Sequence, residues 1–322
     1  MMVRKFRVFI PVTLAILGMT TTWAEDALVF QPRLFGGMGN YSLASGDFDL
    51  KVTTVDGGTI RTKGSATLDW YGNSKLQDVS PILGVGGTLG WGKFFGDIYY
   101  QSTALARSHG SAFGVTTFPD QSQLLAQFGE VDFRHEDWAL SLGYALNSNW
   151  SLFGGYKGGK TQWDQRATQQ GFLPGATTPL FTEIDSLDGR FEQDGPFIGV
   201  AFSYPLGGGT LTLRGAYAYL DGEYAWKGQA KSAATGEVFQ RSTIKLDGNS
   251  DGYSLGMSWT KQLEDNLGLS LGAAYNWYDF DMSGSGSAGL EGSPGGISNL
   301  QFSGGTLTER LFTATASLLY TF

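Results

Sequence analysis

The C-terminal segment alternates strictly between two kinds of side chain. Phe312, Ala314, Ala316, Leu318, Tyr320 and Phe322 fall on one face, and Thr313, Thr315, Ser317 and Thr321 fall on the other, with Leu319 as the exception. A repeat of two residues with one apolar face predicts a β-strand. Aromatic residues at the end of such a strand are typical of a membrane–water boundary. The tail therefore indicates a membrane-embedded strand rather than part of a soluble core.

The N-terminal segment has the pattern of a secretory signal peptide. Arg4, Lys5 and Arg7 precede a short apolar run over residues 8–19, and Ala24 follows as a small residue suited to cleavage. We therefore expect a signal peptide over residues 1–24, export of the chain and a mature protein covering residues 25–322. The net charge of the whole chain is −8, and the signal peptide carries only basic charges. An acidic mature chain without a basic run argues against a nucleic-acid partner.

Composition narrows the class of exported protein. The chain has no cysteine, which excludes disulfides and thiol catalysis. Its mature part has no apolar run near the ~20 residues that a membrane helix needs. It holds 48 glycines, many of them inside strand-like segments. Glycine weakens a strand unless space is tight, so this usage favours a narrow barrel.

Alternating segments recur about ten times, separated in turn by short and long connections. The short ones fall at 90–93, 147–149, 205–209 and 262–266. The long ones are rich in Gly, Ser, Thr and Asp and fall at 43–76, 110–126, 165–190, 227–242 and 284–304. This predicts an all-β fold: a transmembrane antiparallel up-and-down β-barrel of about ten strands, with short periplasmic turns and five long extracellular loops. We expect the last strand to close the barrel against residues 28–41.

The two faces of the predicted strands differ in size. One face is large and apolar, and the other is mostly Gly, Ala, Ser and Thr, which suits the crowded interior of a small barrel. Aromatic residues gather at the strand ends and predict two membrane-interface girdles. The girdle candidates are Trp91, Trp138, Trp150, Tyr204, Trp259, Trp277, Tyr320 and Phe322.

Extending the alternation places a few charges of both signs inside the barrel. They are Arg33, Asp97, Lys157, Arg214 and Glu309. Buried charges persist only when they are paired, so a structural network that fills the lumen is the simpler interpretation. The alternative is a narrow channel that conducts ions past these groups.

A histidine and a carboxylate stand two residues apart on one predicted strand. The chain has two histidines, and His135 is expected to face inward together with Asp137, near Asp97, Tyr99 and Gln101. A carboxylate beside an imidazole is the base and orienting group of many hydrolases. These two residues are the weak catalytic candidates, and the alternative is a polar pair that satisfies its own hydrogen bonds.

One segment partly matches a calcium-binding loop. Asp247, Asn249 and Asp251 occupy its first three ligand positions, but the acidic residue required at position twelve is replaced by Ser258. We regard the three as weak metal candidates and expect turn chemistry at a strand end instead. No metal and no cofactor is expected.

Two segments carry a resemblance to a known family. Residues 195–200 read Gly-Pro-Phe-Ile-Gly-Val and are followed by Ser203-Tyr204, and the chain closes on Leu319-Tyr320-Thr321-Phe322. With ten strands and five loops, the sequence resembles the omptin family of outer-membrane proteases. The resemblance implies the topology. Omptins carry an acidic pair near the second loop and an Asp–His pair near the fourth. Here the fourth loop has no histidine and the second has only Asp120. The omptin catalytic residues therefore have no counterparts.

The sequence as a whole predicts a monomeric, non-enzymatic protein of the bacterial outer membrane. We expect a structural role, or binding of a partner through the loops. The expected partners are outer-membrane lipid and lipopolysaccharide, and the barrel-assembly machinery through the C-terminal strand. The alternatives are a narrow porin-like channel and an omptin-like or lipid-modifying hydrolase that uses His135 and Asp137.

Overall fold

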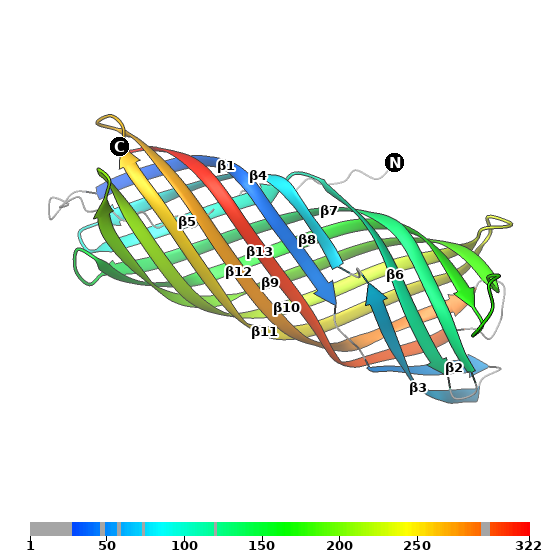
Figure 1. Cartoon of the computed structure of the whole chain (residues 1–322). Coiled ribbons are helices and arrows are strands. Elements are labelled where there is room, and N and C mark those ends of the chain that lie inside the picture. The colour runs from blue at the N-terminus through cyan, green and yellow to red at the C-terminus, as the bar shows by residue number, and fades with distance from the viewer. Residues whose placement is uncertain (1–27, 46–48, 57–58, 73–74, 119–120, 291–296) are drawn as a thin grey trace, which may run out of the picture.

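The computed structural model describes residues 28–45, 49–56, 59–72, 75–118, 121–290 and 297–322, so the predicted signal peptide lies outside the described residues. The described part of the chain contains no helix that could cross a membrane. It forms a single sheet of antiparallel strands (Figure 1). The strands are β1 (Leu28–Ser45), β2 (Asp49–Asp56), β3 (Thr59–Gly72), β4 (Lys75–Trp91), β5 (Phe94–Thr103), β6 (Ala106–Phe118), β7 (Gln121–Ala145), β8 (Trp150–Phe172), β9 (Phe181–Leu206), β10 (Gly209–Ser232), β11 (Val238–Gln262), β12 (Leu267–Leu290) and β13 (Ile297–Tyr320).

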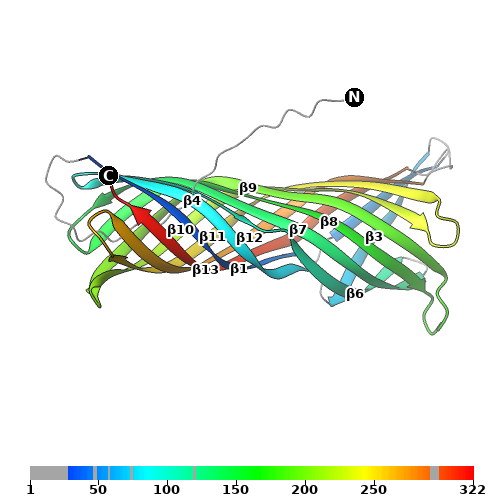
Figure 2. The ribbon, with the colours of Figure 1, turned by 90° about the horizontal axis from the view of Figure 1, so that it is seen from above.

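Ten of these strands close into a ring. Its order is β1-β4-β5-β7-β8-β9-β10-β11-β12-β13, and β13 returns to β1. The closing ladder is antiparallel and runs from Arg33 opposite Leu319 to Ser45 opposite Leu307. The predicted up-and-down barrel of about ten strands is confirmed, as is the pairing of the C-terminal strand with the N-terminal one. The strands are steeply tilted along an elongated barrel (Figure 2).

All four predicted short connections are tight turns at one end of the barrel. They lie at residues 92–93, 146–149, 207–208 and 263–266, and the C-terminus lies at the same end (Figure 1). Gly92, Gly207 and Gly208 have φ values of 57°, 61° and 74°. Glycine adopts this left-handed conformation without the clash that a Cβ would cause, which explains glycine at these turns. We refer to this end as the turn end and to the opposite one as the loop end.

The prediction of five long loops was wrong in its extent, because most of those residues continue the sheet. Strands β8 to β13 run far into the predicted loop segments, and β2, β3 and β6 lie wholly or mainly within them. At the loop end β2, β3 and β6 bridge β13 to β7 and so take the places that β1, β4 and β5 hold at the turn end (Figure 1). Three strands replace three, so the ring continues toward the loop end with the same number of strands.

The half of the barrel next to the turns is apolar outside and polar inside. We define this turn half as the part between the turns and the outward aromatic residues Trp138, Tyr219 and Trp277. Its outward side chains are exposed and large, and include Leu34, Leu83, Val85, Ile98, Leu140, Leu142, Ile198, Leu213 and Leu255. Its buried inward side chains are mostly polar, and include Gln31, Thr88, Ser141, Thr212, Ser258, Ser270, Thr313 and Ser317.

The remaining half, which we call the loop half, has the opposite arrangement. Its interior is a packed apolar cluster whose members include Tyr41, Phe133, Trp163, Phe191, Leu220, Ile244, Leu246, Phe280, Met282 and Leu307. Its outward face carries ion pairs between neighbouring strands: Arg107 with Asp132, Lys160 with Glu192, Arg190 with Glu223 and Lys245 with Glu223. Alternation therefore continues through the predicted loops with its polarity reversed. A search for strands with apolar residues on the outward face therefore does not identify these segments as strands.

Aromatic side chains and glycines pair across neighbouring strands inside the barrel. Phe35 lies opposite Gly84, and Phe153 lies opposite Gly199. A Cβ at either glycine would overlap the ring of its partner. The glycine-rich strands therefore make room for inward rings in a narrow barrel, as the composition indicated.

Candidate functional site in the barrel lumen

The two catalytic candidates meet in the middle of the lumen. His135 and Asp137 are two residues apart on β7, so both side chains point inward. The Nε2 atom of His135 lies 3.0 Å from Oδ2 of Asp137. The Nε2 atom of Gln101 donates a 2.9 Å hydrogen bond to the same carboxylate. On the other side of the imidazole, Nδ1 lies 2.8 Å from the hydroxyl oxygen of Thr161.

Two further residues enclose the imidazole. The ring of Tyr41 stacks on His135 with centroids 4.3 Å apart, and its hydroxyl is 2.6 Å from that of Thr161. Oε1 of Glu309 lies 3.7 Å from Nδ1 of His135, and Gln193 donates a hydrogen bond to the other oxygen of Glu309. The pair is thus one part of a polar cluster drawn from β1, β5, β7, β8, β9 and β13.

These contacts cross the barrel rather than follow its wall. His135 and Glu309 belong to β7 and β13, and Gln193 and Glu309 belong to β9 and β13. In each pair the two strands are separated by three others on the ring. Tyr41 and Thr161 bridge β1 and β8 over the same separation. In a barrel of this size the interior is narrow enough for side chains to meet in this way, so they fill the lumen at this level.

The cluster has the order of groups that a hydrolase uses, namely carboxylate, imidazole and hydroxyl. Nucleophilic catalysis also requires that the hydroxyl reach a substrate. Thr161 is 0% exposed and His135 is 2% exposed. The hydroxyl of Thr161 also contacts that of Tyr41. The geometry therefore suits an internal polar network rather than an accessible catalytic site, although Oε1 of Gln193 and Oε1 of Glu309 are buried without a hydrogen-bond partner.

The predicted lumen charges separate into three places. Arg33 and Asp97 form a fully buried ion pair near the turn end, with two parallel bonds of 2.8 and 2.9 Å. Thr88 donates to the same carboxylate at 2.5 Å. A fork-to-fork pair of this kind is the strongest form of an Arg–carboxylate contact. Glu309 belongs to the histidine cluster described above.

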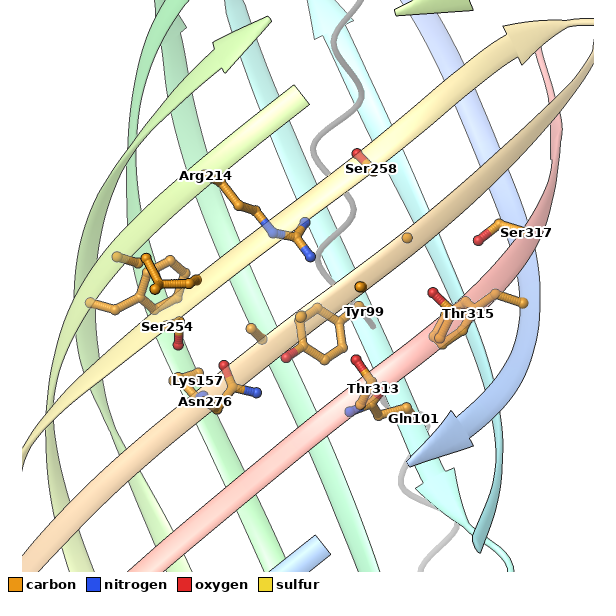
Figure 3. A pocket seen from close by; sticks show the side chains of 18 of the residues that line it. Tyr99, Gln101, Lys157, Arg214, Ser254, Ser258, Asn276, Thr313, Thr315 and Ser317 are labelled. Carbon is orange, nitrogen blue, oxygen red and sulfur yellow. The ribbon is translucent and has the colours of Figure 1, made fainter. Parts of the chain in front are cut away.

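Lys157 and Arg214 lie at a cavity between these two clusters (Figure 3). The ammonium group of Lys157 donates to the hydroxyl of Tyr278 and sits 4.4 Å from the centre of its ring. The cavity has a volume of about 110 Å³ and is lined mainly by residues of the turn half, together with Gln101 of the histidine cluster. Tyr99, Ser254 and Asn276 are among them (Figure 3).

The weak metal candidates lie outside the lumen. Asp247, Asn249 and Asp251 have exposed side chains on the outward face of β11, and the ladders on both sides continue past them. The expectation of a turn at this segment was therefore wrong, because the strand continues through it. Extended backbone also cannot curl around an ion as a calcium-binding loop does. Among the described residues, no group of three or more metal-ligating side chains is found.

The girdle candidates face outward, as the alternation predicts. Seven are exposed and Trp259 is half-buried, with its indole N–H donating to the carbonyl of Leu206. At the margin between the turn half and the loop half, Tyr156 donates to Asp194, and Tyr217 donates to Asp251. Charged groups therefore lie directly beside the aromatic girdle at this margin.

Sequence reasoning missed Tyr41, Thr161 and Gln193, which complete the histidine cluster. Thr161 and Gln193 lie on β8 and β9, beside a segment predicted to be loop. Continuing the inward alternation of Lys157 by four residues would have pointed to Thr161. The contact of Gln193 with Glu309 depends on how the ring closes, and local sequence does not contain that information.

The fold defines a class: the antiparallel up-and-down barrels of outer-membrane proteins. Among solved structures the chain is similar to the outer-membrane protease OmpT from Escherichia coli, with a TM-score of 0.57, 15% sequence identity and coverage of 94% of this chain and 100% of that chain. It is less similar to the translocator domain of the autotransporter NalP from Neisseria meningitidis, with a TM-score of 0.36, 13% identity and coverage of 90% and 88%. No family model and no curated protein matches the sequence. At this identity the likeness to OmpT establishes the shared fold.

Proposed function

We propose that the protein is a non-enzymatic component of the bacterial outer membrane. In this proposal the turn half spans the lipid and the loop half extends into the medium as a binding surface. The turn half supports a membrane location because it exposes a continuous apolar belt with aromatic residues at both margins. The short turns then face the periplasm, as in other barrels of this class.

The observation that carries the proposal is the set of side chains that meet across the lumen. Gln193 contacts Glu309, and Lys157 contacts Tyr278, each over a separation of four steps on the ring. Nearer the loop end, the rings of Phe191 and Phe280 meet edge to face at 5.0 Å. A lumen crossed at several levels favours a closed barrel over a channel.

Single-channel recording tests the closed barrel. We expect the refolded mature protein to show no steady openings in a planar bilayer at high salt. The double variant Phe191→Ala/Phe280→Ala removes both rings of one crossing, while Leu142→Ala changes only the outward face and serves as the matched control. Steady openings of the wild type would contradict the proposal and favour the porin-like alternative.

The absence of enzyme activity needs its own test. The burial of Thr161 and His135 supports a structural role for the cluster. We expect no turnover of peptide, ester or phospholipid substrates by the refolded protein, and no difference between the wild type and His135→Ala. Turnover that the variant abolishes would instead establish the hydrolase alternative.

The loop half supplies the proposed contacts with lipopolysaccharide. Arg134, Arg190, Lys245 and Arg310 have outward side chains beyond the aromatic girdle. Arg310 lies over the indole of Trp277 at 5.5 Å. Arg310 is thus placed directly next to the aromatic girdle, at the level of lipid phosphates, which such a cation binds through charge-assisted hydrogen bonds. The barrel-assembly machinery is the proposed partner of β13 during insertion.

A further inference from the structure

Two oxygen atoms of the histidine cluster have no hydrogen to accept. Oε1 of Glu309 and Oε1 of Gln193 are buried, and neither has a hydrogen-bond partner among the described residues. The two side chains nevertheless meet, because the amide nitrogen of Gln193 donates to Oε2 of Glu309. Buried acceptors without a donor are rare in native proteins, since leaving one unsatisfied is costly. The positions of the hydrogens in this cluster therefore need to be worked out.

The groups around His135 can be arranged so that each has the hydrogen it needs. Nε2 of the imidazole lies 3.0 Å from a carboxylate oxygen of Asp137, so this nitrogen carries a hydrogen. Nδ1 lies 2.8 Å from the hydroxyl oxygen of Thr161, which lies 2.6 Å from that of Tyr41. With a neutral imidazole, Tyr41 donates to Thr161 and Thr161 donates to Nδ1. The two hydroxyl groups have then used their only hydrogens.

Glu309 receives no hydrogen from this arrangement. Its Oε1 atom lies 3.7 Å from Nδ1 of His135, but in the neutral ring that nitrogen is an acceptor. Glu309 is 2% exposed, and burial disfavours the ionised form of a carboxyl. A proton on Oε1 makes that oxygen a donor, and the amide oxygen of Gln193 is the acceptor that remains. One proton therefore supplies both orphaned oxygens.

The other charges near Glu309 oppose one another. The titratable groups that face it are Tyr41 on β1, His135 and Asp137 on β7, Lys157 on β8 and Tyr278 on β12. Lys157 favours an ionised Glu309, whereas the carboxylate of Asp137 favours a protonated one. The ammonium of Lys157 also donates to Tyr278. The contact from β9 is Gln193, which does not titrate.

We propose that Glu309 is protonated in the folded protein and donates its proton to Gln193, which makes this contact a pH-sensitive latch between opposite walls of the barrel. Acid and amide then share two hydrogen bonds between β9 and β13. Ionisation removes the second bond and leaves a negative charge in the lumen beside Asp137. The latch therefore holds at neutral pH and weakens when Glu309 ionises at higher pH.

Infrared spectroscopy of the refolded mature protein tests the proton. A protonated carboxyl has a carbonyl stretch outside the amide bands that shifts in D2O, and a detergent without ester groups leaves this region clear. At pH 8 we expect this band in the wild type and its loss in Glu309→Gln. Glu136→Gln is the matched control, since it alters an outward carboxylate that pairs with Arg134 and should retain the band. A wild type without the band, or a band that persists in Glu309→Gln, overturns the proposal.

Nitrogen NMR of the imidazole tests the rest of the assignment. The chain has two histidines, and the side chain of His109 is 73% exposed. The variant His109→Gln therefore leaves the signal of His135 alone. At pH 7 we expect a neutral ring with its hydrogen on Nε2. A doubly protonated ring would place the proton on His135 and leave Glu309 ionised, which overturns the proposal.

The latch also has a signature in the pH dependence of unfolding. An unfolded glutamate loses its proton near about pH 4.3. From there up to the pH at which Glu309 ionises in the folded protein, each pH unit should raise the equilibrium constant for unfolding about tenfold. Glu309→Gln keeps an N–H that can donate to Gln193, so it mimics the protonated acid and should remove this part of the dependence. Glu136→Gln should retain it. An equal dependence in the wild type and folded Glu309→Gln overturns the latch.

The wild type alone decides the case in which Glu309→Gln does not fold, as judged by heat-modifiable migration on gels. Its carboxyl band should disappear over the same pH range in which the unfolding constant stops rising. A band that disappears in a different range overturns the proposal. Conductance and protonation fail independently: a conducting barrel contradicts the proposed function, and a missing carboxyl band contradicts this inference.

Discussion

The turn half and the loop half are built from the same strands with opposite polarity. On β7, Leu140 and Leu142 face outward in the turn half, while Phe133 is fully buried in the loop half. The outward neighbours in the loop half are Asp132 and Arg134, which make ion pairs at the surface. A single strand therefore presents an apolar face to the outside at one end and to the inside at the other.

Under the proposed orientation, the surroundings of each half account for the difference. Lipid tails would surround the turn half, which explains why its apolar side chains face out and its polar side chains face in. Water would surround the loop half, where the hydrophobic effect drives aromatic and aliphatic side chains inward. The loop half therefore resembles a small soluble barrel continued from a membrane barrel.

The largest effect is expected from the apolar core of the loop half. Phe280 is fully buried and packs edge to face on Phe191. Phe280→Ala should destabilise the protein by about 3–5 kcal/mol, because it removes buried apolar area and leaves a cavity. Urea unfolding of the refolded protein in lipid vesicles measures the change.

An inward position of the turn half supplies the contrast. Thr313 is also buried but lines the lumenal cavity. Thr313→Ala should cost less than about 1 kcal/mol, since no packed apolar contact is lost. Equal costs at Phe280 and Thr313 would show that the two interiors are packed alike and would break the comparison.

The buried ion pair of the turn half gives the next effect. Asp97→Asn leaves the guanidinium of Arg33 buried without a counter-charge, which costs about 3–5 kcal/mol in other proteins. The amide oxygen can still accept one hydrogen bond, so we expect a value near the lower end. The same unfolding assay measures it, and the double variant Arg33→Met/Asp97→Leu should recover most of the loss. If the double variant is as unstable as Asp97→Asn, the charge is not the cause.

A third prediction introduces an arginine on the outward face of each half. Leu142 is 72% exposed within the apolar belt, and Leu142→Arg should cost about 2–4 kcal/mol because it puts a charge into lipid. Asn249 lies between Asp221 and Asp281 on the outward face of the loop half. Asn249→Arg should change stability by less than about 0.5 kcal/mol. Similar costs for both variants in vesicles would mean that the belt does not mark the lipid.

The sequence predicted the turn half well, because its signals are local. The alternation at Leu140 and Leu142, the glycines of two of the four turns and the aromatic girdle can all be identified within a few residues. The same signals predict loops in the loop half, because Asp188, Ser242 and Gly284 suggest turns when considered singly. They form strands because inward partners such as Leu187, Ile244 and Met282 build a core that only the closed ring brings together.

The lumenal site was predictable only in part, for the same reason. His135 and Asp137 share a strand, so their proximity follows from spacing alone. The contacts of His135 with Glu309 and Tyr41 join strands that are far apart in sequence. They depend on the tilt and closure of the barrel, which fix how residues on opposite walls are brought level.

The smallest expected effect concerns pH and the rim of the loop half. Burial raises the pKa of the Glu183 carboxyl to about 7, and the neighbouring carboxylate of Asp185 adds to the rise. Burial also raises the pKa of Asp185 to about 6. Gln169 donates a 2.7 Å hydrogen bond to Glu183 across β8 and β9. Both carboxyls thus hold their protons more tightly in the folded state than in the unfolded chain.

The direction of the pH effect follows from that difference. A group whose folded pKa is raised stabilises the fold below its unfolded pKa, near 4.5 for Glu183, and this stabilisation is lost as the pH rises through the folded value of about 7. The rim strands should therefore open more readily at pH 8 than at pH 5, by less than about 1 kcal/mol because solvent screens this partly exposed site. Hydrogen exchange of peptides from β8 and β9, corrected for intrinsic rates, measures the opening. Glu183→Gln should flatten most of the dependence and leave the part due to Asp185, whereas Glu237→Gln on an exposed turn nearby should leave it unchanged. An identical pH dependence in the wild type and Glu183→Gln would show that Glu183 is not its source. It would also contradict the inference that the interior of the loop half excludes enough water to raise the pKa of a carboxyl at its rim.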